Sequence, residues 1–212
     1  MIDRATLLKD LQLLLPKLEV DLRARASDTP SIDADFRAQH ASALADKRTA
    51  APFLEWREDL LTQVGVAWIL ACVFVRFLED NDFLDTPWIS GPGDRLAAAR
   101  DQQSLYVRAH PTDSDREYLL HVFATVGRLP ALERLYDQHN PLHLFGPSAD
   151  GAESFVRFYQ KTDPATGALH HDFTDPAADT RFVGDLYQDL SEAARKRFAL
   201  LQTPSSAASA SS

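Results

Sequence analysis

The sequence predicts a mostly α-helical fold: a multi-helix bundle with a long central buried helix, irregular loops and at most one short hairpin. Three observations predict it. Apolar residues recur at three- and four-residue spacing through most of the chain. One apolar segment, Pro52 to Glu79, is long enough to be the helix at the centre. No clean alternating run exceeds four residues, and no hairpin of the Asn-Gly or Asp-Gly type is evident.

The first two helices are predicted from caps and leucine spacing. Asp3 is suited to cap a helix in which leucines recur every three or four residues. Pro16 lies inside that pattern, so we expect a kink or a break at the preceding residue. A second helix should have Ser31 as its cap, because Asp33 and Asp35 would then lie in the first turn, where the helix dipole favours acidic groups.

The remaining elements are predicted around proline- and glycine-rich breaks. The stretch DTPWISGPGD ends the long helix and marks a possible subdivision of the domain near residues 86–93. Lys161–Thr180 is turn-rich, with one short hairpin at Thr166-Gly167. Further helices are predicted for Asp94–His110, Asp113–Leu129, Ala131–Tyr136, Gly151–Tyr159 and Asp179–Leu201, the last capped by Asp179 or Thr180.

The composition narrows the class of protein. A net charge of −9 argues against a DNA-gripping surface, which is normally basic. The single cysteine, Cys72, lies in an apolar run and is expected to be a buried small hydrophobe. No signal peptide is evident, and the most apolar run, Val64–Val75, is too short to span a bilayer. We therefore expect a cytoplasmic protein without membrane association.

Motifs of the common enzyme classes are missing. Gly91-Pro92-Gly93 is the one glycine cluster, and its proline removes a backbone N–H where a phosphate-binding loop needs donors. The hydrolase elbow G-x-S-x-G is absent, and no lysine follows an acid in the D/E-x-K spacing of nucleases. Asn140-Pro141-Leu142-His143 and Asp85-Thr86-Pro87-Trp88 imitate the catalytic tetrapeptide of amino methyltransferases, but each lacks a required residue. We interpret both as loops.

Histidine clusters are the remaining candidates for chemistry. His139 and His143 are four residues apart, but a proline between them breaks the helix that would place both on one face. His170, His171 and Asp172 are adjacent, and adjacent side chains usually point apart. We therefore expect no metal site and no catalytic residue in this chain.

Glu79 and Asp80 stand at the C-terminal end of the long helix, where the dipole disfavours acids. Arg76 precedes them by three and four residues, within reach of both side chains. Two interpretations stay open. The group is either a solvated helix end with a weak ion pair, or a structural ion pair that holds the next segment, Phe83-Leu84, against the bundle.

Two stretches carry a resemblance to a known family. Residues 180–204, TRFVGDLYQDLSEAARKRFALLQTP, are similar to the segment that leads into the methyltransferase core of the PglX family, the adenine-specific DNA methyltransferases of BREX phage-defence systems. The stretch RFLEDN, residues 76–81, and its apolar lead-in resemble the N-terminal helical part of the same family. The resemblance covers most of the chain and is closest to the type 2, phage growth limitation branch.

The resemblance implies a domain division. Residues 1–203 would form a helical N-terminal domain, and a core that binds S-adenosylmethionine would follow in the full-length protein. Thr203 and Pro204 match the first residues of the motif that lines the cofactor pocket, but the glycine loop and the catalytic tetrapeptide are absent. We therefore expect no cofactor in this chain alone. Residues 204–212, which after Pro204 are only Ser and Ala, are expected to be a disordered, non-native tail.

The resemblance also implies a non-catalytic role that supports the core and the recognition of DNA or of a partner protein. The expected partners are the methyltransferase core of the same protein, other BREX proteins, and DNA only weakly or indirectly. Candidate phosphate contacts are Lys47, Arg48, Arg195, Lys196 and Arg197, which are otherwise solvated helix ends. Two alternatives stay open: a free-standing helical interaction module or regulator, and an enzyme that uses His170, His171 and Asp172.

Overall fold

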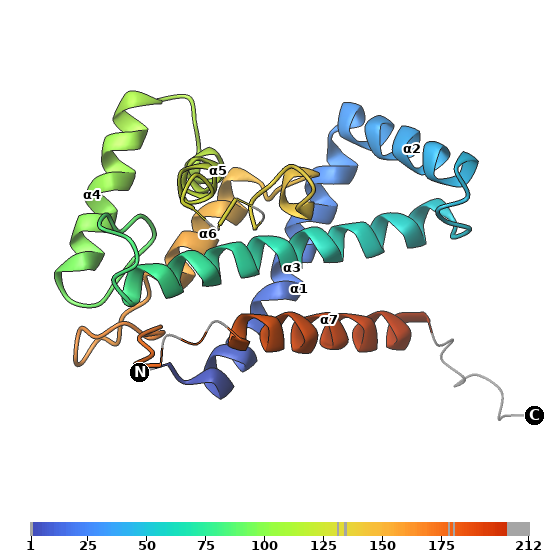
Figure 1. The fold of residues 1–212 in the computed structure, drawn as a ribbon. Coiled ribbons are helices and arrows are strands. Elements are labelled where there is room, and N and C mark those ends of the chain that lie inside the picture. The colour runs from blue at the N-terminus through green and yellow to red at the C-terminus, as the bar shows by residue number, and fades with distance from the viewer. Residues whose placement is uncertain (1, 131, 134, 178, 180, 203–212) are drawn as a thin grey trace, which may run out of the picture.

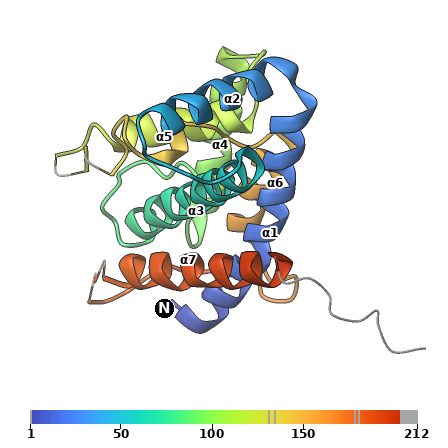
Figure 2. The ribbon, with the colours of Figure 1, turned by 90° about the vertical axis from the view of Figure 1, so that its right-hand side faces the viewer.

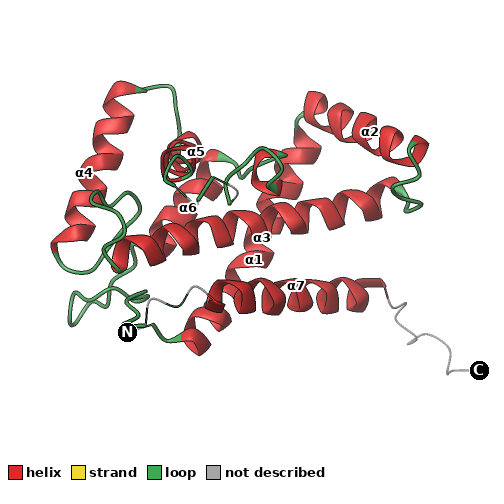
Figure 3. Cartoon of the chain, in the orientation of Figure 1, coloured by secondary structure: helices red, strands yellow, loops and turns green. Residues whose placement is uncertain are grey.

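The protein folds around one long helix. The computed structural model describes residues 2–130, 132–133, 135–177, 179 and 181–202, with side chains as far as residue 196. These residues form seven α-helices, one 3-10 helix and no strand (Figure 3), which confirms the predicted all-α class. The elements are α1 (Arg4–Asp28), α2 (Pro30–Ala45), α3 (Phe53–Asp80), α4 (Asp94–Ala109), α5 (Asp115–Val126), η1 (Pro141–His143), α6 (Ala149–Tyr159) and α7 (Arg181–Gln202).

Helix α3 lies in the middle of the molecule. In two perpendicular views, α2 and α5 lie on one side of α3, and α7 lies on the other (Figures 1 and 2). Helix α1 crosses α3 and extends to both sides, so it contacts α2, α3 and α7. Helix α4 stands beside the C-terminal end of α3 (Figure 1). The long central helix predicted from Pro52 to Glu79 is thereby confirmed within one residue at each end.

The core is built on the apolar C-terminal half of α3. Trp68 is fully buried, donates from Nε1 to the Phe145 carbonyl at 2.9 Å, and packs edge-to-face on Phe123 of α5. The hydroxyls of Tyr136 and Tyr159 donate to backbone carbonyls of α3, those of Ala71 and Ile69. The surrounding segments are therefore attached to α3 by both apolar contact and buried hydrogen bonds.

Two helix starts test the predicted caps. Asp3 caps α1 as expected, because its carboxylate accepts the Thr6 amide at 3.0 Å. The predicted Ser31 cap is wrong: Thr29 is the N-cap of α2, and Pro30 is its first residue. A proline is favoured at that first position because its φ is already helical and it has no amide to leave unpaired.

Pro16 does not break α1, which is continuous from Arg4 to Asp28. Of the expected kink or break, the break is therefore wrong, and the kink stays a prediction. Leu15 and Leu18, on either side of Pro16, are both buried. They lie where α1 meets α3 at Gly65, at which an added Cβ would lie 3.0 Å from Leu15 Cδ1. Burial of this leucine face offsets the cost of an internal proline, which is about 3 kcal/mol.

The helix predicted for Ala131–Tyr136 is also wrong over its described residues, which form turns. Leu132 and Leu135 donate their amides to carbonyls three residues earlier, and Tyr136 is held by Ala71. The contact with α3 therefore outweighs the helical propensity of this segment. The short hairpin is confirmed as a turn: Gly167 has φ 71°, and Thr162 and Leu169 form an isolated bridge.

By length and composition, α3 is the one helix among the described residues that could cross a membrane. About two thirds of its most apolar window, 67%, is buried inside the fold. The expectation that the apolar run is too short was based on 12 residues and needs this correction, since the helix has 28. Burial explains its apolar character, because the core helix of a folded domain has the same composition.

Candidate functional site

The end of α3 carries a buried ionic cluster. Arg76 donates from Nη1 to Glu79 Oε2 and from Nη2 to Asp80 Oδ2, both at 2.8 Å. All three side chains have no exposed area. The interpretation as a solvated helix end is therefore wrong, and Arg76, Glu79 and Asp80 form a structural ion-pair cluster inside the fold.

The cluster binds backbone from two distant segments. Glu79 accepts the amides of Trp88 and Ile89, each at 2.6 Å, and that of Ser90 at 3.2 Å. Asp80 accepts the Phe173 amide at 2.8 Å. The held segments are thus 88–90 and the loop before α7. The predicted segment Phe83-Leu84 is incorrect, since the Phe83 amide bonds to Leu78 within the same helix end.

Burial dominates the electrostatics of the cluster. It raises the pKa of both Glu79 and Asp80, while the Arg76 guanidinium and the backbone donors act in the opposite direction.

Residues 86–93, where the sequence indicated a possible subdivision of the domain, include Ile89 and Ser90, which have no exposed area. The turn after them, with Gly93 at φ 59°, leads into α4.

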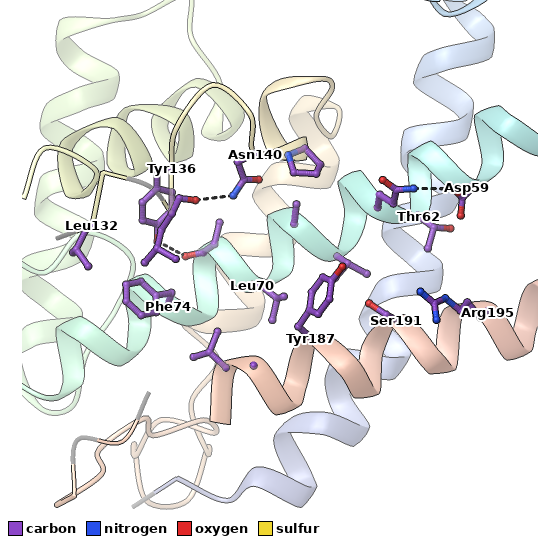
Figure 4. Close-up of a pocket in the computed structure, with 18 residues that line it drawn as sticks. Asp59, Thr62, Leu70, Phe74, Leu132, Tyr136, Asn140, Tyr187, Ser191 and Arg195 are labelled. Atoms are coloured by element: carbon purple, nitrogen blue, oxygen red, sulfur yellow. Dashed lines mark hydrogen bonds between the residues drawn. The ribbon is translucent and has the colours of Figure 1, made fainter. Parts of the chain in front are cut away.

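An apolar groove runs between α3 and α7. It has a volume of about 1040 Å³, and beyond the two helices it is lined by Leu132, Leu135, Tyr136, Asn140 and Pro141. In Figure 4, Leu70 and Phe74 project from α3 toward α7, and Tyr187 projects back from α7. Tyr187 is 56% exposed and Leu135 is 44% exposed, so large apolar side chains line the groove without being covered. Such a groove is typical of a docking surface.

One end of the groove is polar. Asp59 and Thr62 of α3 and Ser191 and Arg195 of α7 lie there (Figure 4). Gln63 donates to Asp59 across one helical turn at 2.7 Å.

The candidate phosphate contacts come from different elements. Lys47 and Arg48 follow α2, and Arg48 is paired with Asp46 at 2.9 Å. Arg195 and Lys196 lie on α7, on the other side of α3 from α2 (Figures 1 and 2). The side chain of Arg197 lies outside the described residues. Among the groups whose side chains are described, the candidate contacts thus lie after α2 and on α7.

The candidate cofactor residues, Thr203 and Pro204, also lie outside the described residues, as does the whole segment 203–212.

The histidines are placed differently from the sequence pattern. His143 bonds from Nε2 to the Tyr136 carbonyl at 3.0 Å, while His139 is exposed. The side chains of His170 and His171 both lie near the carboxylate of Asp10 in α1. Asp10 precedes His170 by 160 residues in the chain. Asp172 does not join them, because its carboxylate accepts the Thr174 amide. Burial and the nearby His170 lower the pKa of His171, which favours its neutral form.

Fold and site together define an all-α domain with a buried ionic cluster at the end of its central helix and an open apolar groove beside its last helix. Within the described residues, neither feature places a nucleophile beside a base.

This chain is similar in sequence to part of a known protein. The chain is 45% identical over 213 aligned residues to the adenine-specific methyltransferase PglX of Streptomyces coelicolor. The match covers 96% of this chain but 18% of the length of that protein. The chain therefore corresponds to one part of a PglX-like protein. No family model matches the sequence, and no solved structure matches it.

Proposed function

We propose that this chain is the non-catalytic, helical N-terminal domain of an S-adenosylmethionine-dependent adenine-N6 DNA methyltransferase that acts in BREX phage defence. The apolar groove between α3 and α7 is the observation that carries its role. The methyltransferase core of the same protein docks there. The protein works in the cytoplasm, and other BREX proteins are further candidate partners.

The choice of the core as occupant rests on length and position. The chain matches 18% of the S. coelicolor protein, so most of such a protein is available to cover the groove. The groove is formed in part by α7, which is the last described helix and the one similar to the lead-in of the core. A groove with uncovered Leu135 and Tyr187 in the free domain is consistent with an interface inside a larger protein.

DNA is a weaker occupant for this surface. The net charge is −9, and among the described residues the groove lining includes one basic residue, Arg195, and one acid, Asp59. We expect the chain alone to bind DNA at most weakly and in a salt-sensitive manner, since such contacts release counterions. We also expect it neither to bind S-adenosylmethionine nor to methylate DNA.

The test is reconstitution from two polypeptides. The 212-residue chain and the remainder of its parent protein are produced separately and mixed, and their affinity is measured by calorimetry. We expect a stable complex that methylates adenine, whereas neither part does so alone. Leu135→Glu and Tyr187→Glu should each weaken the complex at least about tenfold, because they put a charge into the apolar contact.

Leu105→Glu is the matched control, because Leu105 is 55% exposed on α4, away from the groove lining. Equal weakening by Leu105→Glu, or no complex at all, would contradict the proposal. A native gene that ends after Ser212 would instead favour the alternative of a free-standing interaction module or regulator. Micromolar binding of S-adenosylmethionine to the isolated chain would contradict the non-catalytic assignment.

A further inference from the structure

Asp10, His170 and His171 converge from two distant parts of the chain. Asp10 lies in the first half of α1, and the two histidines follow the hairpin turn between α6 and α7. Asp10 Oδ2 lies 2.8 Å from His170 Nε2 and 3.1 Å from His171 Nε2. One ligand atom from each side chain lies within 4.8 Å of the other two.

His171 Nε2 is a buried polar atom aimed into this cluster. It has essentially no exposed surface, and although it is near Asp10 it makes no hydrogen bond of acceptable geometry. A buried polar atom without a good partner costs free energy that a ligand can recover. His170 is 34% exposed, so one side of the cluster is open to solvent.

We propose that Asp10, His170 and His171 bind a divalent zinc ion, with Oδ2 and the two Nε2 atoms as ligands and water in the fourth position. Two imidazoles and one carboxylate suit Zn²⁺ better than the hard ions Ca²⁺ and Mg²⁺. Ligands about 2.0–2.1 Å from a tetrahedral ion lie about 3.3 Å apart. The two observed separations need to open by only a few tenths of an ångström to reach that distance.

The ion would fasten the loop before α7 to α1. The same loop is held two residues later, where the Phe173 amide donates to Asp80 of the buried cluster. The Ile2 amide donates to the Thr174 carbonyl, and Arg4 Nη2 lies 3.6 Å from Asp175 Oδ2. The start of α1 is therefore already in contact with this loop. Zinc binding at Asp10 therefore stabilises the approach to α7, which forms one wall of the groove.

The proposal replaces the sequence-based expectation of no metal site. That expectation considered Asp172 as the third member of the cluster, and Asp172 is bonded to Thr174 instead. The fold supplies Asp10 in its place. The inference is independent of the proposed docking function, because the ligands lie outside the groove lining.

The test is titration of the chelator-treated 212-residue chain with ZnCl₂ by calorimetry, and with CoCl₂ by visible absorption. We expect one equivalent of Zn²⁺ per chain, a Co²⁺ spectrum of a four-coordinate site, and a higher unfolding temperature in the presence of zinc. Asp10→Asn and His170→Ala should each weaken binding at least about tenfold. His170 is partly exposed, so its substitution tests the site without a large change in packing.

His139→Ala is the control, since His139 is an exposed histidine outside the cluster. It should leave the affinity, the spectrum and the zinc-induced stabilisation unchanged. The proposal is overturned if the wild-type chain binds no zinc, or if Asp10→Asn and His170→Ala bind it as well as the wild type. Equal weakening by His139→Ala would show binding to surface histidines and would overturn it too.

Discussion

The carboxylate of Glu79 accepts the backbone amide of Ile89 at 2.6 Å, with both residues fully buried. This contact joins the end of α3 to the chain that leads into α4. Because Glu79 also receives Arg76, a single carboxylate satisfies a buried cation and three backbone amides. Glu79 thus links the end of the central helix to the segment that follows it.

Glu79→Gln should lower the free energy of unfolding by about 3–5 kcal/mol, because it leaves Arg76 with an incomplete counter-charge in a buried site. Urea denaturation followed by circular dichroism measures the change. Glu153→Gln is the control, since Glu153 pairs with Arg157 on the surface. That substitution should cost less than about 1 kcal/mol. Similar losses in both variants would show that the buried cluster contributes no more than a surface pair.

The position of α3 could be predicted from the sequence because its signal is local. The apolar face of Phe53–Asp80 repeats with helical period, and the proline before it and the polar stretch after it bound the segment. The ion pairs of Arg76 could also be predicted from the sequence, since helix geometry places residues at i,i+3 and i,i+4 next to each other. What the carboxylates hold could not be predicted from that spacing.

Other contacts depend on the path of loops. Glu79 meets residues 88–90 only because the chain folds back after α3, and Asp10 meets His170 and His171 across the whole domain. No local period carries this information. The groove between α3 and α7 was equally inaccessible, since its lining combines apolar residues of both helices with the irregular segment 132–141, where helical periodicity predicted a helix incorrectly.

The contribution of the α5 N-terminal cap to the stability of the fold should depend on pH. Burial tends to raise the pKa of Glu117, but its bonds from the Ser114 hydroxyl and amide and from Arg116 outweigh this effect and lower the pKa to about 2. A carboxyl with a lowered pKa stabilises the fold above its unfolded value of 4.5, and this stabilisation is lost as the pH falls toward 2. Glu117→Gln should therefore cost about 1 kcal/mol at pH 7 and progressively less below pH 4.5. Urea denaturation of both proteins across this pH range measures the difference, and a constant difference would contradict the assignment.

Cys72 should be unreactive in the native protein. Its side chain has no exposed area, and burial raises the pKa of the thiol well above its usual value, so little thiolate forms. Under native conditions, a thiol-specific chromogenic reagent should therefore react within minutes with less than about a tenth of the chains. In denaturant the same reagent should titrate one thiol per chain. Rapid native reaction would mean that the centre of α3 opens to solvent.

The crossing of α1 and α3 depends on Gly65. A Cβ there would meet Leu15 Cδ1 at 3.0 Å, and Leu18 and Leu22 lie just beyond. Gly65→Val should destabilise the protein by about 1–3 kcal/mol, since the larger side chain separates two tightly packed helices. Gly184→Ala is the matched control within a helix, because an added Cβ at Gly184 meets nothing within 4 Å. It should stabilise α7 by about 0.5–1 kcal/mol through helix propensity alone. Thermal and urea unfolding of both variants give the two changes, and stabilisation by Gly65→Val would show that α1 and α3 are less closely packed than their contact at Leu15 indicates.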